Sequence, residues 1–148
     1  MYEKVKGFGD FFGFFTEVKF DGKPIGYDFG DCLLQPSSLV YRGKDSVKVE
    51  FVAGNLRNDF RSEKSFLYIE RLDDENWVEV ATDTDWETKL YWIRTNFLLG
   101  FSKVQITWEI PANVTPGMYK VRHVGSYKYW LTGAIYEYEG ETKPFEVR

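Results

Sequence analysis

Hydrophobic and polar residues alternate along several short stretches of the chain, which is typical of β-strands with one buried face. In Ser46–Val52, valine and phenylalanine alternate with lysine and glutamate. The same two-residue period appears in residues 104–110 and in Met118–Val124, where Tyr119 and His123 share one side. These three stretches are therefore predicted to be half-buried strands.

Weaker patterns predict further strands joined by turns. Two hairpins are expected, one around Asp73–Asn76 and one around Thr132-Gly133. Asp21-Gly22 is interpreted as a turn, and Gly125 is expected to end the strand that begins at Met118. The remaining predicted strands are Ser65–Leu72, Trp77–Ala81, Tyr91–Ile93, Tyr127–Leu131, Ala134–Tyr138 and Phe145–Val147, and Asn55–Lys64 is predicted to be a long polar loop.

Taken together, these elements predict an all-β fold. No segment keeps a helical period, and many short strands separated by regular turn signals are typical of an immunoglobulin-like antiparallel β-sandwich. In Pro116–Arg122, a tyrosine follows a turn near the start of a strand, as in the tyrosine corner of such sandwiches. Tyr119 is expected to hydrogen-bond back to that turn.

The chain of 148 residues has the length of one domain. We assign residues 20–148 to that domain and residues 1–19 to an aromatic N-terminal arm or linker. Residues 1–16 contain five phenylalanines among glycines and fit neither a helix nor a strand. We expect Phe11–Phe15 to pack on the core or to contact another domain, since soluble chains rarely expose such patches. A patch that meets a membrane is the alternative.

Composition narrows the range of functions. The net charge is −4, and no basic stripe indicates nucleic-acid binding. The single cysteine, Cys32, excludes an internal disulfide and is expected to be a buried or half-buried thiol. The single histidine, His123, excludes a zinc site with several histidines, and a satisfied core histidine is its expected role. Common hydrolase and nucleotide-binding motifs are missing, so no catalytic centre is visible.

The sequence contains no apolar run long enough for a transmembrane helix. Glycine and aspartate at residues 7–13 interrupt the start of the chain, which therefore does not read as a signal peptide. Two explanations stay open: a cytosolic protein, or a fragment whose boundary is Met1.

A candidate cation site lies in Thr82–Thr88, which combines three carboxylates with three threonine hydroxyls. Asp83, Asp85 and Thr88 follow the pattern D-x-D-x-x-T. Hard oxygen donors at this spacing in a loop suit Ca²⁺ or Mg²⁺ better than Zn²⁺. The alternative is a polar turn whose side chains bond the local backbone.

Aromatic residues are dense near the end of the chain, and two interpretations of them stay open. They can form the site of an independent module that binds sugar or lipid, or they can be ordinary cross-strand pairs. The residues concerned are Tyr127, Tyr129, Trp130, Tyr136 and Tyr138.

Several blocks of the chain, from about Phe20 to the end, resemble the carboxy-terminal immunoglobulin-like domain of the neutral (non-lysosomal) ceramidases. The most distinctive block is Asp85-Trp86-Glu87-Thr88 followed by Tyr91-Trp92. The others are Val49–Asn58, Ser65–Arg71, Gln105–Pro111, Pro116–Gly125 and Tyr138–Val147.

This resemblance implies a two-domain parent enzyme that hydrolyses the amide bond of ceramide to sphingosine and a fatty acid. The catalytic zinc and the serine nucleophile of such enzymes lie in the large amino-terminal domain, so no catalytic residue is expected in this chain. The implied partner is the catalytic domain of the same polypeptide, with a lipid or membrane surface as a further contact of the parent. The parent is expected to be secreted or on the cell surface.

The resemblance also implies a structural Ca²⁺ or Mg²⁺ ion near the domain junction, held by Asp83, Asp85 and Thr88. Backbone carbonyls and water would complete its shell, because Ca²⁺ takes six to eight oxygen ligands. Besides Phe11–Phe15, the apolar stretch Phe97–Leu99 is a candidate for the contact with the catalytic domain.

Overall fold

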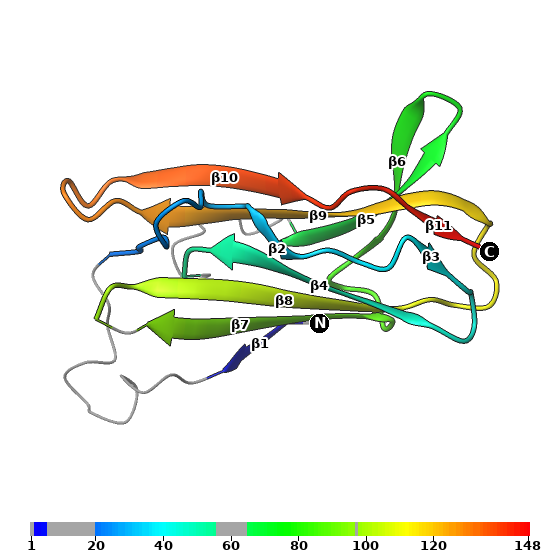
Figure 1. Ribbon diagram of the computed structural model, residues 1–148, viewed down its shortest axis with the longest axis horizontal. Coiled ribbons are helices and arrows are strands. Elements are labelled where there is room, and N and C mark those ends of the chain that lie inside the picture. The colour runs from blue at the N-terminus through cyan, green and yellow to red at the C-terminus, as the bar shows by residue number, and fades with distance from the viewer. Residues whose placement is uncertain (1, 6–19, 56–64, 97) are drawn as a thin grey trace.

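The computed structural model describes residues 2–5, 20–55, 65–96 and 98–148, and within these ranges the regular structure is entirely β. The strands in chain order are β1 (Tyr2–Val5), β2 (Cys32–Leu34), β3 (Leu39–Val40), β4 (Ser46–Ala53), β5 (Leu67–Asp73), β6 (Asn76–Thr82), β7 (Thr88–Asn96), β8 (Phe101–Glu109), β9 (Gly117–Lys128), β10 (Ile135–Glu141) and β11 (Phe145–Val147) (Figure 1).

The strands form two sheets. One sheet has the order β1-β7-β8-β4-β2, and the other has the order β3-β11-β9-β5-β6, with β10 also paired to β9. The pairs β1–β7 and β3–β11 are parallel, whereas the other pairs of named strands are antiparallel. This arrangement confirms the all-β, immunoglobulin-like sandwich predicted from the alternating pattern.

The core lies between the sheets and contains the apolar residues of the predicted alternation. Val47, Val49 and Phe51 of β4 are at most 2% exposed. Their register partners on β8 are Trp108, Ile106 and Val104, which are equally buried. On the second sheet, Tyr119, Val121 and His123 of β9 face the same interior. Burial of these side chains is the main favourable contribution to folding.

Tyr119 forms the predicted tyrosine corner. Its hydroxyl donates a hydrogen bond of 2.5 Å to the carbonyl of Thr115, four residues upstream. Its ring packs against Trp108 across the sandwich, with centroids 5.4 Å apart. The bond fixes the turn that enters β9, which is the longest strand among the described residues.

His123 is the satisfied core histidine that the sequence predicted. Its Nε2 atom lies 2.9 Å from the hydroxyl of Tyr138, and that hydroxyl accepts a hydrogen bond from Gly54 N. The carbonyl of Phe66, 2.7 Å from Nδ1, can only accept, so Nδ1 donates to it. The ring thus joins two segments of the second sheet, and the Tyr138 hydroxyl extends this link to Gly54, which follows β4 of the first sheet.

Two local predictions were wrong. Gly125 does not end a strand, because β9 continues to Lys128. A side chain at this glycine would place its Cβ 2.4 Å from the Tyr138 hydroxyl, so the position needs close approach and not a break. Asp21-Gly22 does not turn either; the turn spans Pro24–Tyr27, where Tyr27 N donates to the carbonyl of Pro24.

Of the remaining predictions, one lies within the described residues and others fall outside them. Cys32 is a half-buried thiol, as predicted, and burial raises the pKa of its thiol. Phe11–Phe15 and most of the predicted loop Asn55–Lys64 lie outside the described residues, as does most of the predicted arm. Among the residues that the structure describes, no helix is long and apolar enough to cross a membrane.

Candidate functional site

The acidic loop, residues 82–88, connects β6 to β7 at one end of the sandwich. It also touches the last residue of β8, because Glu109 N donates to the carbonyl of Glu87 at 2.8 Å. The loop begins and ends inside the strands that flank it. Its backbone is thus held at both ends by the same sheets that form the core.

Asp85 and Thr88 bind the backbone of the loop itself. One carboxylate oxygen of Asp85 accepts a hydrogen bond of 2.6 Å from Thr82 N. The hydroxyl of Thr88, which is fully buried, lies 2.5 Å from the carbonyl of Thr82 and 3.0 Å from that of Asp85. These contacts are those of a self-capped polar turn.

Asp83 reaches outside the loop. Its Oδ2 atom accepts a hydrogen bond of 3.1 Å from Phe66 N, just before β5 begins. The carbonyl of Phe66 in turn accepts bonds from Val124 N and from His123. One carboxylate of the acidic loop is therefore connected through a single residue to the buried histidine of the core.

The three predicted ligands share this loop and have the chemistry that a hard cation requires. Asp83 and Asp85 are partly exposed, and each is a carboxylate. The Thr88 hydroxyl gives its one proton to a carbonyl, and its oxygen is a hard donor atom of the kind that such a cation takes. Among the described residues no three His, Cys, Asp or Glu side chains gather as a metal site, so an ion here would depend on two carboxylates, the hydroxyl, the backbone and water.

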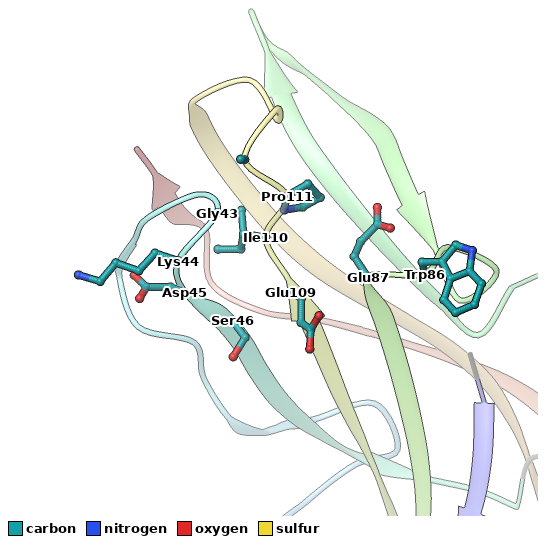
Figure 2. Close-up of a pocket in the computed structure, with 10 residues that line it drawn as sticks. Gly43, Lys44, Asp45, Ser46, Trp86, Glu87, Glu109, Ile110 and Pro111 are labelled. Atoms are coloured by element: carbon teal, nitrogen blue, oxygen red, sulfur yellow. The ribbon is translucent and has the colours of Figure 1, made fainter.

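A cavity of about 740 Å³ lies beside the acidic loop (Figure 2). Its walls are the turn that leads into β4, Trp86 and Glu87 of the loop, and residues 109–112 at the end of β8 and just after it. In Figure 2, the carboxylates of Glu87 and Glu109 point in different directions, and the indole of Trp86 points away from Pro111. These two carboxylates therefore do not converge on one point in the cavity.

Sequence reasoning missed this cavity because its walls come from three segments distant in sequence. The exposed indole of Trp86 was within the distinctive Asp-Trp-Glu-Thr block, yet exposure is not visible in a sequence.

The predicted aromatic cluster divides between core and surface. Tyr138 is buried against His123, and Tyr127 stacks on Phe29 with centroids 4.1 Å apart. Trp130 and Tyr136 are exposed. Cross-strand packing therefore accounts for part of the cluster, and the exposed part remains a candidate surface.

Comparison with known proteins shows which protein family the chain matches. Residues 9–147 match the family described as neutral/alkaline non-lysosomal ceramidase, C-terminal. The chain belongs to this family. The match covers the acidic loop and both sheets apart from β1, so the resemblance noted in the sequence is confirmed.

Relatives in the family show how much of a longer protein the chain represents. It is 46% identical over 134 residues to the neutral ceramidase of Drosophila melanogaster, and 43% identical over 137 residues to that of Pseudomonas aeruginosa. The match covers 90% of this chain but only 19% and 20% of those proteins. The chain thus spans about a fifth of the length of these relatives.

A solved structure supports the same conclusion about the fold. The crystal structure of the Pseudomonas aeruginosa neutral ceramidase superposes with a TM-score of 0.84 and 41% identity, covering 90% of this chain and 21% of that one. The chain therefore has the fold of one domain within a much longer polypeptide.

Proposed function

We propose that this chain is the non-catalytic carboxy-terminal domain of a ceramide-hydrolysing enzyme, supporting the fold of the catalytic domain and holding a Ca²⁺ or Mg²⁺ ion where the two domains meet. The observation that carries the proposal is the family match over residues 9–147 together with the coverage of only about a fifth of the relatives. The hydrolysis itself would belong to the part of the polypeptide that those relatives have in addition.

The position of β1 supports a junction beside the acidic loop. Tyr2 pairs with Leu90, two residues after the loop ends at Thr88, and β1 then runs parallel to β7. A domain that precedes residue 2 would therefore approach the sandwich at this end. The fully solvated face of Trp86 and the cavity next to it offer that domain a contact surface.

Within this proposal, Asp83, Asp85 and Thr88 supply the side-chain oxygens for the ion. The ion would neutralise two carboxylates in one short loop and hold the loop against the start of β5, to which Asp83 already binds. We expect its role to be structural, because the described residues around the loop bring no three His, Cys, Asp or Glu side chains together.

The ion can be tested by thermal unfolding of the 148-residue chain with Ca²⁺ and with EDTA. Saturation at 100 times the dissociation constant stabilises a folded protein by about 2.7 kcal/mol, which raises the melting temperature by roughly 8 °C for this size. Asp85→Asn keeps an oxygen that can accept the bond from Thr82 N but removes the charge, and we expect it to abolish the rise.

The matched control is Asp73→Asn at the exposed end of β5, which should keep the full rise. Equal melting curves of the native chain in Ca²⁺, Mg²⁺ and EDTA would exclude the ion. A loss of the rise in the control as large as in Asp85→Asn would place ion binding elsewhere.

The accessory role has its own test. The isolated chain should release no fatty acid from a fluorescent ceramide under conditions in which a full-length family member does. Hydrolysis by the isolated chain, retained after removal of trace contaminants, would contradict a non-catalytic role.

A further inference from the structure

The end of the sandwich opposite the acidic loop exposes large apolar side chains on two neighbouring turns. Leu98 and Leu99 of the β7–β8 turn are 81% and 53% exposed, and Trp130 and Leu131 of the β9–β10 turn are 64% and 65% exposed. We call these four residues the apolar tip. The nine residues of β7 separate it from the acidic loop by about 30 Å.

A cavity of about 490 Å³ lies directly behind the apolar tip. Leu99 and Trp130 line it, so both turns contribute to its wall. Its other walls are mainly aromatic, with Phe20, Phe29, Phe101, Tyr127 and Tyr129. The size lies within the range of pockets that accept small apolar ligands or hydrocarbon chains.

Both turns are held in place by backbone hydrogen bonds. In the β9–β10 turn, Tyr129 N donates to Ala134 O and Gly133 N donates to Tyr129 O. The β7–β8 turn is bound to the N-terminal segment by the bond from Gly22 N to Gly100 O. The apolar side chains therefore project from fixed turns, and their exposure does not come from a missing backbone partner.

Charged side chains are absent from the two turns of the tip and begin directly beside them. Residues 98–101 and 129–135 contain no charged side chain. Lys128 pairs with Ile135 next to the β9–β10 turn, and Tyr136 pairs with Tyr127 one position further from the tip, with its ring centroid 6.3 Å from that of Tyr129. Tyrosine and lysine beside exposed apolar residues are side chains that favour a membrane interface.

We propose that the apolar tip docks on a phospholipid bilayer, with Leu98, Leu99, Trp130 and Leu131 entering the boundary between headgroups and acyl chains. A separate protein partner fits less well, because a stable protein interface takes about 20–30 residues a side and the tip is two narrow turns around a hollow. The catalytic domain, for which Phe97–Leu99 was a candidate contact, would approach the opposite end of the sandwich, where β1 begins. The charge-free turns also fit a lipid surface of zwitterionic headgroups, and a net charge of −4 gives no attraction to anionic lipid.

This inference goes beyond the proposed accessory function and does not depend on the ion. The test is flotation of the 148-residue chain with phosphatidylcholine vesicles in 0.1 M and 0.5 M NaCl. Binding should be nearly independent of salt, since it comes from apolar burial and not from charge. The double variant Leu98→Asn, Leu131→Asn should bind at least about tenfold more weakly, because it removes two buried leucines from the bound state.

The matched control is Val80→Asn, Met118→Asn, which replaces two exposed apolar residues on β6 and β9 away from the tip. It should bind as the native chain does. Equal weakening of both variants, absence of binding by the native chain, or binding that needs anionic lipid and disappears in 0.5 M NaCl would each overturn the proposal.

A fluorescence measurement distinguishes insertion of the apolar tip into the bilayer from attachment to the bilayer surface. Brominated acyl chains should quench the fluorescence of Trp130, and the quenched component should disappear in Trp130→Phe while vesicle binding remains. Unquenched Trp130 on a bound chain would show that the tip stays outside the bilayer. Because the ion test uses no lipid and the vesicle test can be run in EDTA, failure of either proposal leaves the other intact.

Discussion

The two ends of this sandwich use polar groups in opposite ways. At the acidic end, three carboxylates and three threonines lie within seven residues, yet Asp85 and Thr88 bond mainly to the loop's own backbone. At the apolar end, where leucine and tryptophan face the solvent, a single carboxylate is almost completely buried. That carboxylate is Asp21, at 3% exposure.

Asp21 joins segments that are far apart in the chain. One of its oxygens accepts a bond of 2.9 Å from Asn55 N, and the other accepts a bond of 2.8 Å from Lys128 N. The guanidinium of Arg94 lies 3.9 Å away and is itself buried. The backbone N–H of Asp21 also donates a hydrogen bond to the carbonyl of Lys128.

This difference shows that the segment richest in acidic residues need not contain the carboxylate on which the stability of the fold depends. A buried charge is costly unless several donors satisfy it, and removal of the charge then leaves those donors unpaired. At the acidic end most bonds connect residues within six positions, so their loss disturbs one loop. The following substitutions test this contrast.

Asp21→Ala should have the largest effect. It removes the acceptor of the bonds from Asn55 N and Lys128 N and the carboxylate beside Arg94, and we expect a loss of about 3–5 kcal/mol in the free energy of unfolding. Urea unfolding of the native chain and of Asp21→Ala measures this loss. Asp28→Ala, which removes an exposed and solvent-screened partner of Lys23, should cost much less. Similar losses of unfolding free energy in Asp21→Ala and Asp28→Ala would show that the buried carboxylate stabilises the fold no more than an exposed one.

Thr88→Val should have an intermediate effect. The change keeps the shape but removes the hydroxyl that binds the carbonyls of Thr82 and Asp85, which costs about 1–3 kcal/mol at a buried position. Thr84→Val in the exposed part of the same loop is the control. A loss for Thr88→Val greater than for Asp21→Ala would reverse the comparison.

Tyr119→Phe should have the smallest effect. The ring stays packed against Trp108, and only the single neutral bond to Thr115 O is lost, so we expect about 1 kcal/mol. The exposed Tyr41→Phe should change stability by less. A loss above about 3 kcal/mol would mean that the corner organises this end of the sandwich as strongly as Asp21 organises the other.

Most of the strands could be predicted because each depends on a local pattern. The alternation in residues 46–52 and 104–110 requires one buried face wherever the strand lies, and Tyr119 bonds to a carbonyl only four residues away. His123 was also predictable, since a single histidine among apolar neighbours has few other roles. The candidate ligands Asp83, Asp85 and Thr88 were found for the same reason: they share one short loop.

The rest depends on residues that are distant in sequence. Asp21 lies in a stretch that has the local features of a turn, but its partners are 34 and 107 residues away. Gly125 has the local features of a strand end, but it is needed because Tyr138 packs directly against it. Neither partner can be identified from the residues next to these positions.

The sequence by itself determined the all-β class, the face that each strand buries and the family to which the chain belongs, because these follow from periodicity and from local blocks of residues. Only the tertiary structure decided that Asp21 is buried, that the acidic loop and the apolar tip lie at opposite ends, and that two turns meet around one cavity. Those features arise when the two sheets close on each other and bring separate segments together. Their energies depend on that closure, because an unsatisfied polar group or an exposed leucine is defined only by what surrounds it.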